Sequence, residues 1–139
     1  MGLAQLIVHE SGRRWIDHIR SRMAAAVRVR HSTTVPESLR LLRGERETLL
    51  VVELGQQPLA ALELIEQANA ADSEVTVLVL ADSSQRGLEL SARELGAVEF
   101  IVEPITPGEV ADIVERAALS MLASPAPQRM MRPAAAALI

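Results

Sequence analysis

Short β-rich runs alternate with stretches of helical periodicity along this chain, and this alternation limits the fold more than any other feature. The β-rich runs are at residues 3–8, 26–30, 48–54, 75–81 and 98–103. Apolar residues recur at helical spacing in 11–25, 36–43, 58–70, 84–95 and 107–122. Repeated strand–helix units of this kind predict a parallel sheet with helices on both faces and right-handed crossovers.

The composition of single runs predicts their places in the sheet. Runs 48–54 and 75–81 are continuous blocks rich in Leu and Val, as expected of central parallel strands buried on both faces. The run 26–30 alternates Arg28 and Arg30 with valines, which is typical of an exposed edge strand. An edge position for the second strand favours the order 2-1-3-4-5. The predicted fold class is therefore α/β, a flavodoxin-like (βα)5 doubly wound sheet of five parallel strands.

The ends of the helices and of the domain carry their own signals. Ser11 and Thr106 are predicted to cap the first and last helices, and Gly96 is predicted to end the fourth. The repeats end at Leu122, and the chain length suits one domain, which we place at residues 1–123. Residues 124–139 are rich in Pro and Ala and are predicted to be a linker or a tail.

Composition narrows the classes of function. The fourteen basic residues are all arginines and the net charge is −4, which argues against nucleic acid as the partner of this domain. The absence of Cys excludes thiolate metal sites and Cys nucleophiles. The sequence has no Gly-rich phosphate-binding motif and only two aromatic residues, so nucleotide and flavin binding are not expected. Without a membrane-length apolar run or a secretion signal, the predicted location is cytoplasmic, with no membrane partner.

Polar residues gather where this sheet order would place a ligand. In the order 2-1-3-4-5, ligands lie at the carboxyl ends of the first and third strands, where the strand order reverses. His9 and Glu10 follow the first strand, Glu53 ends the third and Glu103 ends the fifth. We therefore expect one imidazole and three carboxylates to share a small surface.

The segment 94–110, ELGAVEFIVEPITPGEV, resembles the receiver domains of two-component response regulators. It has the family's Gly-Ala step, an aromatic residue, two apolar residues, a charged residue with a proline, and a capped last helix. The acids after the first and third strands add to the resemblance, which covers residues 3–122. It implies a CheY-like domain with a role in signal transduction.

The chain departs from this family at the residues that handle phosphate. Glu53 stands where receivers carry the phosphorylated Asp, and one extra methylene moves its carboxylate outward by about 1.3–1.5 Å. A displacement of that size is serious for in-line phosphoryl transfer. Glu103, before Pro104, stands where receivers have a Lys, so the charge that would stabilise the phosphoryl oxygens is reversed.

The remaining family positions are changed in part. His9 and Glu10 occupy the acidic pair that holds Mg²⁺, so one acid of the pair survives. Leu80 is assigned to the strand-end Thr or Ser position and carries no hydroxyl. The aromatic switch residue is kept as Phe100, which we expect to fill the space beside Leu80.

These departures predict a degenerate pseudo-receiver, which is not an enzyme and acts by phosphorylation-independent protein–protein interaction. No cofactor is predicted. One alternative is an atypical receiver that is phosphorylated on Glu53, with Mg²⁺ held by Glu10 and Glu53. Another is a small flavodoxin-like ligand-binding module or enzyme that uses His9, Glu10 and Glu53. A fourth interpretation of Glu53 is a solvated strand-end acid without a role.

The last helix predicts a contact with another protein. Its apolar face is wider than the stripe needed to pack against one surface, which suggests burial against the sheet and against a second subunit. We predict a protein partner or output domain, and a homodimer formed by helix 84–95, strand 98–103 and helix 107–122. The predicted interface residues are Val110, Ile113, Val114, Ala117 and Met121.

Overall fold

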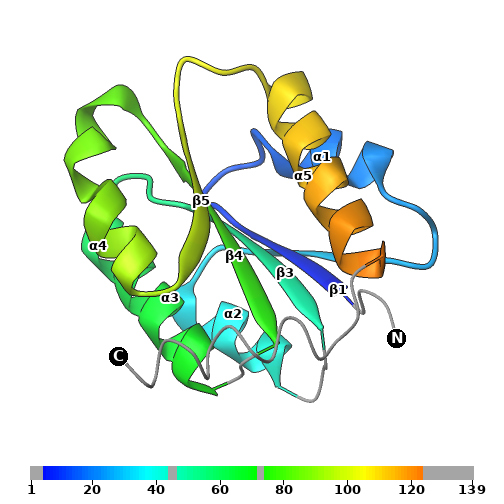
Figure 1. The fold of residues 1–139 in the computed structure, drawn as a ribbon, viewed down its shortest axis with the longest axis horizontal. Helices are drawn as coiled ribbons and strands as arrows, with labels where there is room; N and C mark the ends of the chain where they lie inside the picture. Colours follow the sequence, from blue (N-terminus) through cyan, green and yellow to red (C-terminus); the bar gives the residue numbers. More distant parts are fainter. Residues whose placement is uncertain (1–4, 44–46, 72–73, 124–139) are drawn as a thin grey trace.

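One sheet of five parallel strands, in the order β2-β1-β3-β4-β5, forms the centre of the molecule (Figure 1). The computed structural model describes residues 5–43, 47–71 and 74–123. The strands are β1 (Gln5–His9), β2 (Arg28–Ser32), β3 (Thr48–Glu53), β4 (Val75–Ala81) and β5 (Ala97–Val102). The helices are α1 (Ile16–Arg22), α2 (Val35–Leu42), α3 (Pro58–Ala71), the 3-10 segment η1 (Ser83–Leu88), α4 (Glu89–Glu94) and α5 (Pro107–Ala123). The predicted flavodoxin-like fold class and strand order are confirmed, whereas the predicted tail, 124–139, lies outside the described residues.

Helices cover both faces of the sheet. Figure 1 shows α1 and α5 on one face and α2, α3 and α4 on the other. Because successive strand residues point to opposite faces, Leu49 and Val51 of β3 pack in the core under α1 and α5, while Leu50 and Val52 pack in the other core. All four side chains are fully buried, as predicted for a central strand. The edge position of β2 is also confirmed.

The first helix is shorter than the sequence pattern predicts. It begins at Ile16, and the backbone N–H groups of Trp15 and Ile16 donate to the carboxylate of Glu10. The prediction that Ser11 caps this helix is wrong, since Ser11 is exposed and the acid one residue earlier satisfies the free N–H groups.

The other helix ends follow their predicted signals more closely. Thr106 and Glu109 form a capping box, in which the N–H of Glu109 donates to Thr106 Oγ1 at 3.1 Å and the N–H of Thr106 donates to Glu109 Oε1 at 2.8 Å. Gly96 ends α4 with a φ of +126°, a conformation that side chains disfavour. The predicted helix 84–95 is divided into η1 and α4, and η1 starts from its own cap at Asp82.

The apolar face of α5 is mostly used within the chain. Val110, Val114 and Met121 are at most 5% exposed and belong to the core shared with α1. The prediction that these three form an intersubunit interface is wrong, because α1 packs beside α5 and covers the part of the face that the sheet does not. Ile113 and Ala117 are half-buried. Among the described helices, none is long and apolar enough to cross a membrane.

Candidate functional site

Glu10 follows β1, and its carboxylate lies under the start of α1. Its Oε2 accepts the N–H of Ile16 at 2.8 Å, and both oxygens lie 3.2 Å from the N–H of Trp15. The residue is 1% exposed. Burial raises the pKa of Glu10, and the charge of Glu53 adds to this, whereas the two backbone N–H groups lower it. Glu10 therefore fixes the beginning of α1.

Glu53, the last residue of β3, is bonded to the same loop. Its Oε2 accepts a 2.9 Å hydrogen bond from the indole Nε1 of Trp15. The Trp15 side chain is fully buried, so this bond supplies the partner that its only polar side-chain atom needs. The other oxygen of Glu53, Oε1, has no hydrogen-bond partner among the described residues. The end of β3 is thus tied to the residue that precedes α1.

Arg14 connects this pair to the end of β5. Its guanidinium carbon lies 4.2 Å from the centroid of the Trp15 ring, which is a cation–π contact. Its Nη1 lies 2.8 Å from Oε1 of Glu103. Glu103 precedes Pro104 and immediately follows β5. The predicted convergence of Glu10, Glu53 and Glu103 therefore occurs, and two residues of the β1–α1 loop link them.

His9 contacts α2 and takes no part in the contacts around Trp15. Its Nδ1 lies 2.8 Å from Oγ of Ser38, which also contacts Oγ of Ser32. Burial lowers the pKa of His9, with a further lowering by His31 and an opposing effect of Glu37, so the imidazole is neutral near pH 7. Since Ser38 is fully buried, no substrate reaches its hydroxyl, and the Ser38–His9 pair is a structural contact.

Leu80 and Phe100 lie on opposite faces of the sheet. Leu80 is 2% exposed in the core under α1 and α5, whereas Phe100 is 8% exposed in the other core. The prediction that Phe100 fills space beside Leu80 is therefore wrong. Ala81, the last residue of β4, shares the core that contains Phe100. A difference of one position along a strand is enough to exchange the faces.

The site offers no ready set of metal ligands. In the parts of the chain that the structure describes, no three His, Cys, Asp or Glu side chains are grouped to hold a metal ion. Glu10 accepts backbone N–H groups, Oε2 of Glu53 accepts the indole N–H, and Glu103 is paired with Arg14. Each of these acids thus has at least one oxygen in a contact within the chain, whereas a Mg²⁺ site would need several free oxygen ligands in one place.

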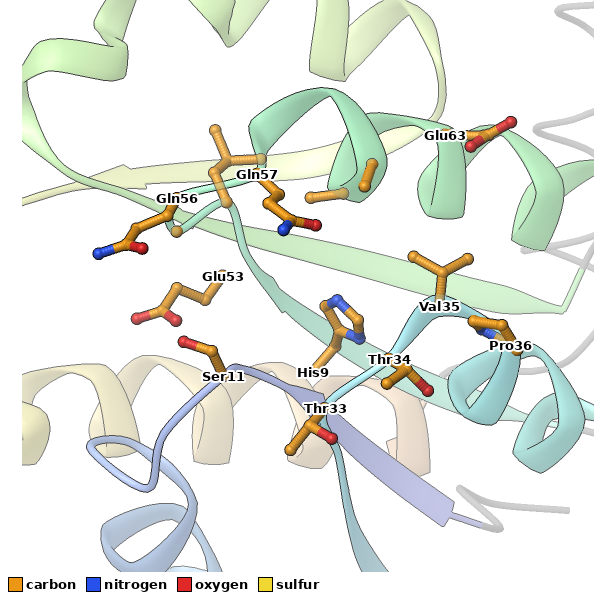
Figure 2. Close-up of a pocket in the computed structure, with 14 residues that line it drawn as sticks. His9, Ser11, Thr33, Thr34, Val35, Pro36, Glu53, Gln56, Gln57 and Glu63 are labelled. Atoms are coloured by element: carbon orange, nitrogen blue, oxygen red, sulfur yellow. The ribbon is translucent and has the colours of Figure 1, made fainter.

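A pocket of about 580 Å³ opens beside Glu53 (Figure 2). It is lined by the end of β1, the start of α2, the β3–α3 loop and the first turns of α3. The β3–α3 loop turns at Gly55, whose φ is +59° and whose carbonyl accepts a 2.7 Å hydrogen bond from Nε2 of Gln85. Of the lining residues, only His9 and Glu53 were candidates from the sequence. The Gly and Gln residues that follow Glu53 predict a turn, and this turn was the sequence feature that could have indicated the loop residues of the pocket.

Comparison with known proteins identifies relatives of the fold. No family profile and no curated protein sequence matches the chain. Similar solved structures include CheY-like response regulator receiver domains. A response regulator receiver domain protein (CheY-like) from Methanospirillum hungatei JF-1 matches with a TM-score of 0.70 and 14% identity, over 86% of this chain and 97% of that chain.

Two further solved structures with a similar fold are described as other kinds of protein. Full-length FixJ from B. japonicum matches with a TM-score of 0.70 and 20% identity, over 92% of this chain and 63% of that chain. An adenylate cyclase from Rhodopirellula baltica matches with a TM-score of 0.71 and 12% identity, over 86% of this chain and 90% of that chain. At these identities the likeness shows a shared fold, and function has to be argued from the site.

Proposed function

We propose that this chain is a degenerate receiver domain of the two-component type, which acts through protein–protein contact without phosphorylation or enzymatic activity. The observation that supports it most is the hydrogen bond from Trp15 to Glu53. At the strand end where receivers carry the phosphorylated Asp, this chain has a longer acid that is bonded to a buried side chain of its own.

The groups around Glu53 support the same proposal. Phosphoryl transfer depends on positioned cations that neutralise the developing charge. At the Lys position the chain has Glu103, and the nearby cation, Arg14, is paired with that acid and stacked on Trp15. The surviving acid of the metal-binding pair, Glu10, holds the start of α1.

The hydroxyl of the receiver switch is missing as well. The fourth strand of receivers ends on Thr or Ser, and β4 ends at Ala81, in the core that contains Phe100. The equivalent position is therefore Ala81 and not Leu80, and neither side chain can donate a hydrogen bond to a phosphoryl group. Phosphorylation on Glu53 would lack the contact that couples it to Phe100.

A partner would then be recognised by a surface that does not depend on phosphate. FixJ extends beyond the part that matches this chain, which agrees with a protein partner or an output domain. We retain the homodimer through α4, β5 and α5 in revised form, with the exposed Leu90 and Leu119 in place of the buried residues of α5.

The proposal is tested by titrating the protein with Mg²⁺ and beryllofluoride, a phosphoryl mimic, while recording Trp15 emission. Trp15 is the only tryptophan and it contacts Glu53, so a bound phosphoryl mimic would change its emission. We expect no saturable change at millimolar concentrations, and no phosphorylated species by mass spectrometry after incubation with acetyl phosphate. A Mg²⁺-dependent change that Glu53→Gln abolishes and Glu66→Gln preserves would establish the phosphorylation-competent alternative instead.

A further inference from the structure

The pocket beside Glu53 has its own polar groups, distinct from the network around Trp15. Oε2 of Glu53 is bonded to Trp15, whereas Oε1 lies near Gly55, where an added Cβ would be 3.5 Å from it. Both Glu53 and Gly55 line the pocket. One oxygen of the acid thus belongs to the network, and the other remains available to a ligand.

His9 contributes a ring nitrogen to the same pocket. The residue is 9% exposed, and its Nδ1 is occupied by Ser38. Its Nε2 has no hydrogen-bond partner in the described residues, and Figure 2 shows the ring lying between the β3–α3 loop and the start of α2. With Nδ1 occupied, Nε2 is the ring nitrogen that a ligand in the pocket can contact.

The charged residues in the pocket lining determine whether a positively or a negatively charged ligand is favoured. Among the described residues, the pocket lining includes two carboxylates, Glu53 and Glu63, and no arginine. Figure 2 shows these two acids toward opposite ends of the pocket, with His9 between them. At the start of α2, the N–H of Glu37 already donates to Thr34 Oγ1 at 3.3 Å, and Pro36 has no N–H to offer an anion. An anion is repelled here and a cation is attracted.

We propose that this pocket binds a linear aliphatic polyamine, with its terminal ammonium groups at Glu53 and Glu63 and an inner amine at Nε2 of His9. The methylene groups would lie on the apolar part of the lining, to which Val35, Pro36 and Ala60 contribute. The volume of about 580 Å³ is within the range of small-molecule sites. An ammonium at Nε2 selects the tautomer in which Nδ1–H donates to Ser38. This inference goes beyond the proposed signalling role and does not depend on it.

The test is a titration of the ¹⁵N-labelled protein with spermidine, followed by amide shifts of the β3–α3 loop and the start of α3. Butylamine, which carries one ammonium, and succinate, which carries the opposite charge, serve as comparison ligands. We expect saturable shifts with spermidine, weaker binding of butylamine and no binding of succinate. Glu63→Gln should weaken spermidine binding about fivefold.

Glu66→Gln is the matched control, since Glu66 is also exposed on α3 and its loss changes the net charge equally, but it does not line the pocket. Spermidine affinity should be unchanged in this variant. Equal weakening by both variants would show unspecific attraction to an acidic protein and would overturn the proposal. The proposal would also be overturned if millimolar spermidine caused no saturable shifts, or if succinate bound as tightly as spermidine. None of these outcomes bears on the response to beryllofluoride, so the two proposals fail separately.

Discussion

Trp15 Nε1 donates a 2.9 Å hydrogen bond to Glu53 Oε2, joining the residue before α1 to the last residue of β3. Together with the hydrogen bonds that Glu10 accepts from Trp15 and Ile16, it occupies the carboxyl end of the sheet with groups of the chain itself. A receiver needs this edge open to a metal ion and a phosphoryl group. Here the same edge is a set of internal contacts, which leads to specific expectations for stability.

Glu53→Gln should cost about 1 kcal/mol of unfolding free energy, because a neutral acceptor replaces a charged one. Glu53→Ala should cost about 2 kcal/mol, because it leaves the indole N–H of the fully buried Trp15 without a partner. Urea unfolding followed by Trp15 emission measures both values. Equal effects of the two substitutions would mean that the hydrogen bond contributes nothing.

The Arg14–Glu103 ion pair should be weak and sensitive to salt. Its side chains are 48% and 27% exposed, and pairs of this kind couple by about 0.2–1 kcal/mol. A double-mutant cycle with Arg14→Gln and Glu103→Gln should give such a value at low salt and a smaller one at about 1 M salt. The exposed pair Arg93–Glu89 is a suitable reference cycle. A coupling that persists at high salt would show that the pair is more shielded than its exposure indicates.

His9 should make the protein less stable as the pH falls below neutrality. Its pKa is lowered in the folded state, so as the pH falls the unfolded chain binds a proton first, near the ordinary histidine pKa of 6.5. This contribution to stability is therefore present above that pH and is lost as the pH falls toward the folded pKa. We expect His9→Gln to reduce the decrease in unfolding free energy between pH 7.5 and pH 5.5.

Glu10, whose pKa is raised, acts in the opposite direction and is unchanged in His9→Gln, so the difference between this variant and the unaltered protein isolates His9. Parallel pH profiles for His9→Gln and the unaltered protein would contradict the expectation.

On α5, stability and self-association should respond to different residues. Val110→Ala removes two methyl groups from a fully buried side chain and should cost about 2 kcal/mol without changing the oligomeric state. Leu119, 58% exposed, should tolerate Leu119→Ser within about 0.5 kcal/mol. If α5 forms the proposed homodimer contact, sedimentation will show weaker association of Leu119→Ser. Association that weakens with Val110→Ala alone would argue for the original interface prediction.

Several parts of the site could be read from the sequence because they depend on local pattern. The strand ends place Glu10, Glu53 and Glu103 at one edge as soon as the strand order is known, and the order follows from Arg28 and Arg30 on an edge strand. The cap at Thr106 and the stop at Gly96 are encoded within a few residues. These predictions needed no knowledge of how distant side chains meet.

Other features depend on side chains that are far apart in the sequence. Periodicity shows that Val110, Val114 and Met121 are buried, but it does not show whether α1 or another molecule covers them. The extent of β4 decides that Ala81 and not Leu80 faces Phe100, since one residue changes the face. The pocket arises only where the β3–α3 loop meets the start of α2.

The sequence alone determined the class of fold, the strand order and the identity of the acids at the carboxyl edge, because the alternation of apolar and polar residues decides which elements form and which are central. Only the tertiary structure decided that Trp15 and Arg14 occupy this edge, bonded to Glu53 and Glu103. The physical reason is that hydrogen bonds and ion pairs depend on the distance and direction between atoms. Those are set by packing, and residues 38 and 89 positions apart acquire them only when the sheet has formed.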